Sequence, residues 1–395
     1  MRPDHRSIAA LATSALTALG ALLVPAAVTS AEAKPINPDA PLTVMTRNLY
    51  LGADIQRPLR AVAGVSDPSM ALVKLANANA VTRTVVDQTN FPRRSELLTR
   101  EIAAHQPDLI ALQEVALWRH GPLELDPAKV AVPNAQSVDY DFLQILVDDL
   151  ATAGLDYTPV RVQQESDVEA PAFTGVPPAF TSPQDVRLTM RDVVLMRNRP
   201  GLTLSDTGGG NFADELVVPL AGKAMTFTRG FAWADVKVGA KKVRFINTHL
   251  EAFGSDHALA QAKELLAGPA DEQGMTTIIA CDCNSDPLDG RPSNGVERRA
   301  PYDSIVASGF TDQWLHWKPA ADGWTSGLSE RVNDTSAGQF DHRIDMIFAR
   351  TPSGKPLDVT QGQVTGTQLT DRDPVTGLWP SDHGGVELTL SGKDS

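Results

Sequence analysis

Six short polar segments, each at or just after a non-polar run, hold the residues of this chain that could do chemistry. In chain order they are Thr46-Arg47-Asn48, Leu112-Gln113-Glu114, Asn247-Thr248-His249-Leu250-Glu251, Asp282-Cys283-Asn284, Arg343-Ile344-Asp345 and Pro380-Ser381-Asp382-His383-Gly384. Carboxylate and amide oxygens suit a hard cation such as Mg²⁺ or Ca²⁺. Histidine transfers protons near neutral pH. The set therefore predicts a metal ion beside an acid/base pair.

The acidic residues of these segments lie where a strand ends. Glu114 ends the non-polar run 109–113, where a carboxylate is costly unless it is paired or bound to a metal. We expect a metal ligand, with a salt bridge to an arginine as the alternative. Strand alternation places Asp282 and Asn284 on one side, where they could hold a water molecule and a phosphoryl oxygen. Alone, the pair would indicate only a turn before Pro287.

Two histidines end or follow non-polar strands. His249 and His383 lack the spacing of a zinc motif, so we do not expect zinc. With Asp345 to orient one of them, they could form an acid/base set. The alternative is that both are structural.

The only cysteines are Cys281 and Cys283, and they point to the same side of a predicted strand. We do not expect a disulfide between them, because a strand holds such a pair near the upper distance limit with parallel Cβ directions. Two buried thiols are the favoured interpretation, and a thiolate metal site is the alternative.

Residues 1–33 have the features of a secretory signal peptide. Arg2 and Arg6 precede a long Ala/Leu-rich run that ends at Ala31-Glu32-Ala33. A membrane anchor is the alternative, but no later segment is long and non-polar enough to span a bilayer. We expect a secreted, monomeric protein without stable membrane insertion, in which residues 34–395 form a single catalytic domain. The net charge of −13 disfavours nonspecific adhesion to nucleic acid or anionic membrane.

Short non-polar strands alternate with amphipathic helices along the rest of the chain. Strands are predicted at 42–48, 109–113, 157–163, 186–196, 231–238, 242–248, 276–283, 343–349 and 386–390, and helices at 93–105, 139–153 and 255–266. Gly239-Ala240 predicts a hairpin, and Ser255 a helix N-cap. Hairpins together with helical crossovers predict mixed sheets covered by helices. We expect irregular insertions at 56–91, 118–137 and 164–185, either as solvated loops or as walls of the substrate site.

The six segments, in this order, resemble the motifs of the endonuclease/exonuclease/phosphatase superfamily. The resemblance runs from Asn48 to His383, and its specificity comes from the order of motifs that are weak singly. The superfamily includes pancreatic-type deoxyribonucleases, abasic-site endonucleases, bacterial sphingomyelinases and inositol-polyphosphate phosphatases. The resemblance implies a four-layer α/β sandwich, with two mixed β-sheets face to face and helices outside. It also implies a hydrolase of phosphate esters that needs Mg²⁺, or else Mn²⁺ or Ca²⁺.

The resemblance also implies roles for single residues. A divalent cation would be bound by three residues, namely Glu114 with Asn48 and Asp382 nearby. Catalysis would fall to five others, namely His249, His383, Asp345, Asp282 and Asn284. The base towards water would be His383, oriented by Asp345, whereas His249 would bind the phosphoryl oxygen or act as an acid. Asp282 and Asn284 would position the water and the phosphate.

Some features depart from the family pattern. The usual Gly-Asp-Phe-Asn is Cys281-Asp282-Cys283-Asn284 here, which keeps both polar residues but changes the packing behind them. Asp54 is either an extra ligand or a turn residue. Asp192 either reaches the site or forms a salt bridge with Arg191 or Arg197.

The sequence leaves the phosphate ester open. A nuclease predicts a basic cleft, with five candidate residues: Arg93, Arg94, Arg187, Arg191 and Arg229. A phospholipase C- or sphingomyelinase-type enzyme predicts exposed aromatic side chains at the rim, with candidates Trp314, Trp317, Trp324, Phe173 and Phe180; core packing is the alternative for the tryptophans. The acidic charge favours a lipid headgroup or a small phosphodiester over nucleic acid. A phosphomonoesterase and a non-catalytic binding protein are the remaining alternatives.

Overall fold

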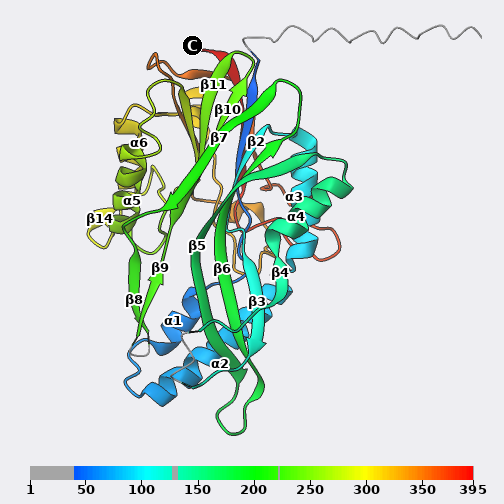
Figure 1. Cartoon of the computed structure of the whole chain (residues 1–395), viewed down its shortest axis with the longest axis vertical. Coiled ribbons are helices and arrows are strands. Elements are labelled where there is room, and N and C mark those ends of the chain that lie inside the picture. Colours follow the sequence, from blue (N-terminus) through cyan, green and yellow to red (C-terminus); the bar gives the residue numbers. More distant parts are fainter. Residues whose placement is uncertain (1–39, 127–131, 221–222, 395) are drawn as a thin grey trace, which may run out of the picture. The chain divides into compact units, whose positions relative to one another are not determined.

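Two large β-sheets form the middle of this computed structural model, which describes residues 40–126, 132–220 and 223–394 (Figure 1). The first sheet has the order β17 (Leu357–Thr365), β18 (Gly385–Asp394), β1 (Leu42–Asn48), β2 (Leu109–Gln113), β6 (Thr181–Arg197), β3 (Leu117–Pro122) and β4 (Ser137–Asp141), and β5 (Tyr157–Thr174) also pairs with β6. The second has the order β15 (Thr311–Asp312), β16 (Asp345–Arg350), β12 (Thr276–Asp282), β11 (Lys241–His249), β10 (Gly230–Val238) and β7 (Leu202–Asn211). Both sheets contain parallel and antiparallel pairs.

The inner faces of the two sheets share one non-polar core. Val44 and Val194 of the first sheet belong to the same buried cluster as Ala234, Phe245 and Ile278 of the second. Strand alternation sends every other side chain into this cluster, so the sheets lie face to face.

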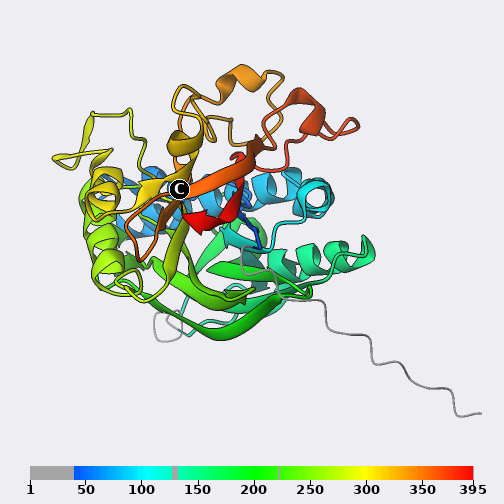
Figure 2. The ribbon, with the colours of Figure 1, turned by 90° about the horizontal axis from the view of Figure 1, so that it is seen from above.

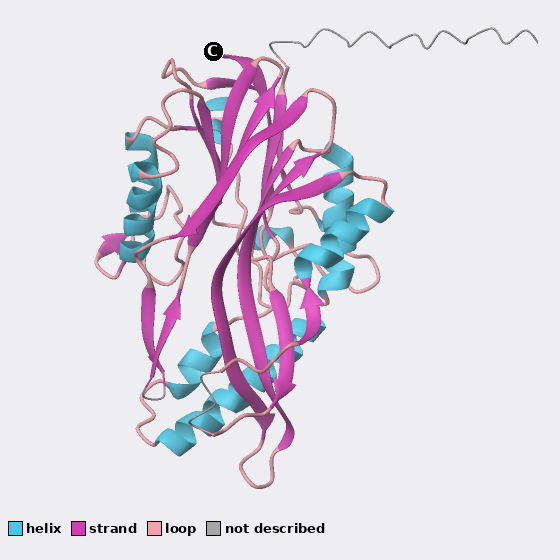
Figure 3. Cartoon of the chain, viewed as in Figure 1, coloured by secondary structure: helices cyan, strands magenta, loops and turns pink. Residues whose placement is uncertain are grey.

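Helices cover the outer face of each sheet. The first sheet packs against α2 (Pro68–Gln88), α3 (Phe91–His105) and α4 (Phe142–Thr152), and the second against α5 (Ser255–Ala267) and α6 (Ala300–Ala307). Figures 2 and 3 show α3 and α4 on the opposite side of the strands from α5 and α6, and Figure 3 shows α2 near the far end of the β5–β6 hairpin. The prediction of a four-layer α/β sandwich is therefore confirmed.

Strand register brings the polar segments together at one end of the sheets. Parallel pairing sets His249 opposite Asp282, and antiparallel pairing sets Asp282 opposite Asp345. In the other sheet, Asn48 lies opposite Gln113. Asp345 is the first residue of β16, and the other four are the last residues of their strands, so all of these side chains lie where the chain enters or leaves a sheet.

Two of the three irregular insertions that we expected are regular. Residues 56–91 contain α1 (Gln56–Val62) and α2, and residues 164–185 belong to the long hairpin of β5 and β6. We did not predict helix α2 from the sequence. Its buried face mixes small and polar residues such as Ala76, Asn79 and Thr82, so its buried and exposed faces differ little in hydrophobicity. Residues 118–137 include most of β3, but the described residues between β3 and β4 are irregular, as expected. Unexpected strands also form at β7, β8 (Leu216–Leu220), β9 (Lys223–Phe227) and β17.

Several boundaries differ from the predictions. Residues 137–141 form strand β4, and Asp141 then caps α4 by accepting from the amide of Leu143. The N-cap of α5 is Gly254 rather than Ser255. The predicted hairpin at Gly239-Ala240 is confirmed, because it joins the antiparallel strands β10 and β11.

Cys281 and Cys283 form a disulfide, so the expectation of free thiols was wrong. Strand β12 ends at Asp282, so Cys283 is the first residue after the strand. The two Cα atoms are therefore only 5.1 Å apart, which is within the usual range for a disulfide. Both side chains lie in the outer core with Ile279, on the opposite side of the strand from Asp282, as alternation predicts.

The predicted signal peptide, residues 1–33, lies outside the described residues. Among the described helices, none is both long and non-polar enough to cross a membrane.

Candidate active site

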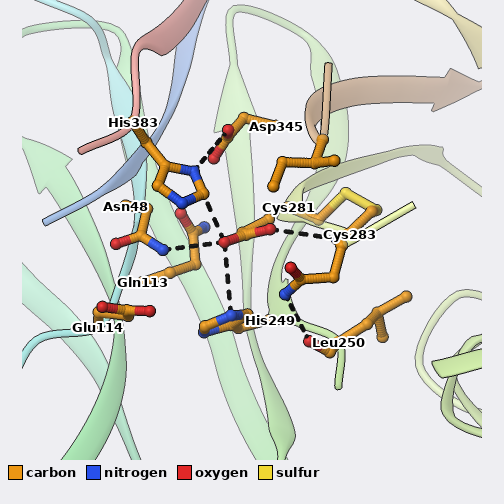
Figure 4. A network of polar contacts seen from close by, with 12 residues as sticks. Asn48, Gln113, Glu114, His249, Leu250, Cys281, Cys283, Asp345 and His383 are labelled. Atoms are coloured by element: carbon orange, nitrogen blue, oxygen red, sulfur yellow. Dashed lines mark hydrogen bonds and ion pairs between the residues drawn. A yellow bond between two sulfur atoms is a disulfide. The ribbon is translucent and has the colours of Figure 1, made fainter. Parts of the chain in front are cut away.

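Figure 4 shows a polar network that includes Asn48, His249 and His383. The carboxylate of Asp282 contacts all three of these side chains. Its Oδ2 accepts a hydrogen bond from Asn48 Nδ2 at 2.9 Å. The same oxygen lies 3.4 Å from His249 Nε2 and 3.8 Å from His383 Nδ1. The structure thus places the two histidines on either side of one buried carboxylate. Burial, followed by repulsion from Asp345, raises the pKa of Asp282 to about 7.

Asp345 holds His383 in place. Its Oδ2 lies 2.9 Å from Nδ1 of the imidazole, and a carboxylate can only accept, so Nδ1 carries the hydrogen and Nε2 points away. The second oxygen, Oδ1, is buried without a hydrogen-bond partner. Burial alone would lower the pKa of His383, but attraction to Asp345, Asp382 and Asp282 raises it well above its usual value.

His249 has a cationic neighbour instead. Arg229 Nη1 lies 3.0 Å from its Nδ1, and because a guanidinium only donates, Nδ1 must accept and Nε2 carries the hydrogen. Burial, and then repulsion from Arg229 and His383, lowers the pKa of His249 well below its usual value. The site therefore contains one imidazole biased towards the cation and one held neutral.

Glu114, Asn48 and Asp382 supply the oxygens expected for a metal. Glu114 Oε2 accepts from the amide of Leu51 at 2.7 Å, and Asn48 Oδ1 accepts from that of Tyr50 at 2.7 Å, so both oxygens are directed by backbone contacts. Burial raises the pKa of Asp382 to about 6, and repulsion from Glu114 adds to the effect. A cation between the two carboxylates would remove that repulsion, so this donor set fits a hard divalent metal.

Asp282, Asp345 and His383 also have ligand atoms within 4.8 Å of one another. Two of these residues, however, His383 and Asp345, already share a hydrogen bond. The neighbouring disulfide provides no thiolate. Hard oxygen ligands are therefore what the site offers.

The active-site residues line one end of a cavity of about 400 Å³. The six that line it are Glu114, His249, Asp282, Asn284, Asp382 and His383. Asn48 and Asp345 are fully buried and make their contacts from behind these residues. The eight residues predicted from the sequence thus come together, six of them as walls of the cavity and two as supports.

Two buried arginines hold the loops that carry the site, a role that the sequence did not predict for either of them. Arg94 donates to the carbonyls of Leu49, Tyr50 and Pro380, at 2.6, 2.9 and 3.0 Å. Arg47 donates to the carbonyl of His383. Arg47 stands in one of the polar segments, and Arg94 was considered only as a residue of a basic nuclease cleft. Neither observation distinguishes these residues from surface arginines.

Left-handed backbone conformations occur at three residues around the cavity. The φ angles of Tyr50, Glu114 and Asn284 are 59°, 55° and 44°. Non-glycine residues rarely adopt such angles outside sites that require them. At Asn284 the turn is held because its amide donates to Asp282 Oδ1 at 3.1 Å, and its side chain donates to the carbonyl of Leu250. The turn and the functional interpretation of this pair therefore coexist.

Asp192 forms neither of the salt bridges expected for it. Arg191 instead pairs with Asp141, and Arg197 donates to Gln106. Asp192 is buried beside Glu165, and burial followed by repulsion from Glu165 raises its pKa well above the usual value. The sequence did not predict that Asp192 lies beside Glu165, because these residues come together only when β5 pairs with β6.

Asp54 behaves as a turn residue. Its Oδ1 accepts from the amide of Gln56 at 2.8 Å, and its Oδ2 contacts Arg60. It also lines the cavity.

Comparison with known proteins agrees with this geometry. The model of the Endonuclease/Exonuclease/phosphatase family matches residues 86–383. The chain belongs to this family. Its members are hydrolases that act on phosphodiester bonds and generally use a divalent metal, so this chain is a metal-dependent hydrolase of phosphoric esters. No curated protein sequence matches the chain.

Several solved family structures are similar to this one. An endonuclease/exonuclease/phosphatase from Beutenbergia cavernae is 22% identical, with 89% of this chain and 71% of that chain covered and a TM-score of 0.49. A family protein from Bacteroides thetaiotaomicron is 15% identical, with 89% and 98% covered and a TM-score of 0.48. D. rerio TDP2, complexed with a single-strand DNA product, is 14% identical, with 89% and 99% covered and a TM-score of 0.48.

Proposed function

We propose that this family member is a secreted phosphodiesterase of the phospholipase C or sphingomyelinase type, acting on small or lipid-derived phosphodiesters. The observation that carries the proposal is the scarcity of cations around the cavity. Among the described residues that line it, Arg229 is the only lysine or arginine. Arg229 is already engaged with His249 and with Glu251, whose carboxylate lies 3.4 Å away. One phosphate needs few cations, whereas a nucleic-acid strand needs a row of phosphate contacts.

The other arginines considered for a nuclease do not face the cavity. Arg93 pairs with Asp373 at 2.6 Å, Arg191 pairs with Asp141 at 2.6 Å, and Arg187 pairs with Asp167. Arg94 is fully buried, and its guanidinium donates hydrogen bonds to backbone carbonyls. Each is therefore neutralised or enclosed by the protein itself, which supports a substrate other than nucleic acid.

The rim aromatics that we expected for a lipid enzyme do not support it. Trp314 and Phe173 are buried, and none of the five candidates lines the cavity. Core packing, the alternative for the tryptophans, is correct for Trp314, which stacks edge-on against Trp317. Support for a lipid-type substrate comes from the cavity instead.

The proposed reaction is attack of water on phosphorus with loss of an alkoxide. A divalent cation held by Glu114, with Asn48 and Asp382, would polarise the phosphoryl oxygen and lower the pKa of bound water. Once deprotonated, His383 Nε2 accepts a proton from the attacking water while Asp345 holds the Nδ1 hydrogen. The water oxygen bonds to phosphorus, the ester P–O bond breaks, and the departing alkoxide takes a proton from a solvent water molecule, while the proton on His383 returns to solvent.

The neutral His249 suits hydrogen bonding to the phosphate. Its Nε2–H would donate to a phosphoryl oxygen, a role that needs no titration near neutral pH. Asn284 and Asp282 would position the phosphate and the water beside it. Of the two roles considered for His249, the contact with Arg229 supports phosphoryl binding over acid catalysis, because it opposes protonation.

Export is part of the proposal. It is supported by the residues of the 1–33 segment and by the disulfide, since disulfides persist mainly in oxidising compartments. Sequencing the N-terminus of protein recovered from the culture medium tests it, and retention of residues 1–33 on a cell-bound protein would contradict it.

A substrate panel tests the proposed activity. Purified protein with Mg²⁺, Mn²⁺ or Ca²⁺ would be given sphingomyelin, phosphatidylcholine, glycerophosphodiesters, inositol phosphates, plasmid DNA and RNA. We expect hydrolysis of a lipid or small diester, with release of a phosphomonoester. Faster cleavage of DNA or RNA would show that the nuclease alternative is correct.

A further inference from the structure

The cavity that begins at the active-site residues continues into a non-polar compartment. Strands β5 and β6 contribute Val168, Ala170, Val186, Leu188 and Met190, which share one face of the hairpin because of strand alternation. Helices α1 and α2 and strand β9 supply further non-polar side chains: Pro58, Leu59, Leu75, Met225 and Phe227. Elements far apart in sequence thus enclose one hydrophobic space.

Polar side chains in this compartment are already occupied. Asn79 Nδ2 donates to the carbonyl of Pro171 at 2.9 Å. Thr82 Oγ1 accepts from Arg57 at 3.2 Å, and the carboxylate of Glu330 contacts the same guanidinium at 2.5 and 2.6 Å. Ser166 exchanges hydrogen bonds with the backbone of Thr228. A polar ligand would therefore find few free partners in the compartment.

Much of the non-polar wall is only partly buried by the protein. Val168, Leu188 and Phe227 are half-buried although they line an indented surface. Covering such surface is favourable in proportion to the area removed from water. Ordered water needs several polar partners to be held in such a space, and this wall offers few.

We propose that this compartment binds a single hydrocarbon chain carried on one ester oxygen of the phosphodiester substrate. The inference rests on the proposed function, since it assigns the phosphate to the polar end of the same cavity. The continuity of the non-polar wall with Glu114 and His249 decides the occupant, because a chain attached to a phosphate bound there would enter the compartment directly. The compartment would select for an aliphatic ester group and against a nucleoside.

Chain length tests the proposal in catalysis and in binding. Hydrolysis of p-nitrophenyl methyl, butyl and octyl phosphodiesters would be measured below their aggregation concentrations. Calorimetry with methyl-, butyl- and octylphosphonate, in the presence of Mg²⁺, would report binding without turnover. We expect kcat/KM and affinity to rise with chain length by up to roughly fourfold per methylene, equivalent to about 0.8 kcal/mol.

Two variants alter the compartment without touching the active-site residues. Ala170→Leu fills it, and Leu188→Ser makes it more polar. Both should flatten the dependence on chain length while hydrolysis of the methyl diester stays within about threefold, since the phosphate end is unchanged. The matched control is Val162→Leu, which enlarges an exposed β5 residue outside the cavity and should keep the dependence.

The outcomes separate this inference from the proposed function. Equal affinity for all three phosphonates, or a dependence that survives Ala170→Leu and Leu188→Ser, would overturn the chain-binding compartment. Chain-dependent binding that these variants abolish, without hydrolysis of any diester, would support the compartment and contradict the proposed function.

Discussion

At the scale of single residues, the two histidines differ because their neighbours differ. His383 is flanked by carboxylates, which favour its cation, whereas His249 faces Arg229, which opposes protonation. Environments that push the pKa values of paired groups apart commonly separate their catalytic roles. We therefore expect both histidines to be needed, for different reasons.

Removing either histidine tests that expectation. His249→Ala and His383→Ala should each lower turnover at least about a hundredfold, with little change in Tm, because a placed proton-transfer or donor group contributes roughly 10² to 10⁴. The double variant should be scarcely worse than either single one, since groups that act together are not additive. Steady-state kinetics check this.

A third histidine provides the control. His257 lies on α5, where its Nδ1 contacts Asp214 at 2.6 Å, and it does not line the cavity. His257→Ala should be nearly silent. Damage as large as that of His383→Ala, or near-normal turnover of His383→Ala, would show that the active site has been misplaced.

Glu114 is the residue on which metal binding should depend. Glu114→Gln keeps the shape and the contact with the amide of Leu51 but removes the charge. We expect the Mg²⁺ concentration for half-maximal activity to rise at least about tenfold, because Mg²⁺ is held by few protein carboxylates. Chelation should abolish wild-type activity and added metal should restore it. Full activity in a chelated preparation would contradict the metal requirement.

At the scale of elements, buried arginines hold the loops that leave the strands. Arg94 of α3 reaches the loop after β1 and the segment before His383, which are far apart in sequence. Backbone carbonyls in such loops must find donors when they are buried. One guanidinium thus sets the distance between the segments that carry Asn48 and Asp382.

Arg94→Met should therefore be strongly destabilising. It leaves several buried carbonyls without donors, and each costs about 1–3 kcal/mol, so we expect the Tm to fall by more than about 5 °C. Arg100→Met, at an exposed position on the same helix, is the control and should change the Tm little. Thermal denaturation followed by circular dichroism measures both. Equal Tm values for the two variants would contradict this role.

The disulfide between Cys281 and Cys283 should contribute little to catalysis, although it lies next to the active-site residues Asp282 and Asn284. Both sulfur atoms face the outer core, away from Asp282 and Asn284. Replacing both cysteines by alanine should keep activity within about tenfold, since alternation separates the two faces of the strand. Metal content measured by mass spectrometry should be unchanged. Loss of metal with an intact fold would show that the cysteines support the metal site.

At the scale of the whole molecule, burial between the layers raises the pKa of acidic groups. Glu165 lies on β5 beside Asp192, and burial raises its pKa from 4.5 to about 8. A raised folded-state pKa gives stability that is complete below the unfolded value and is lost as pH rises through the folded value. This group should therefore make the chain progressively less stable between about pH 4.5 and pH 8.

Glu165→Gln removes that dependence. In metal-free protein, the Tm of the variant relative to the wild type should increase as pH rises from 4.5 to 8, because glutamine carries no charge to bury. Glu215→Gln, at an exposed position, is the control and should not change the slope. A constant difference between Glu165→Gln and the wild type across this range would show that folding does not raise the pKa of Glu165.

Local patterns in the sequence determined much of this protein. Alternating and helical periodicity predicted the central strands and α3, because each element needs one face or stripe to be non-polar. Polar residues at strand ends, such as Glu114, His249 and Asp282, could be chosen as a set because a strand end places a side chain at the edge of a sheet whatever its neighbours are.

Only the tertiary structure decided what those residues contact. The pairing of Arg229 with His249, the burial of Asp192 beside Glu165 and the bond between Cys281 and Cys283 depend on chain directions and on segments distant in sequence. The non-polar compartment likewise exists only once α2 meets the β5–β6 hairpin. A pKa or a cavity sums contributions from all surrounding groups, and local sequence contains only a few of them.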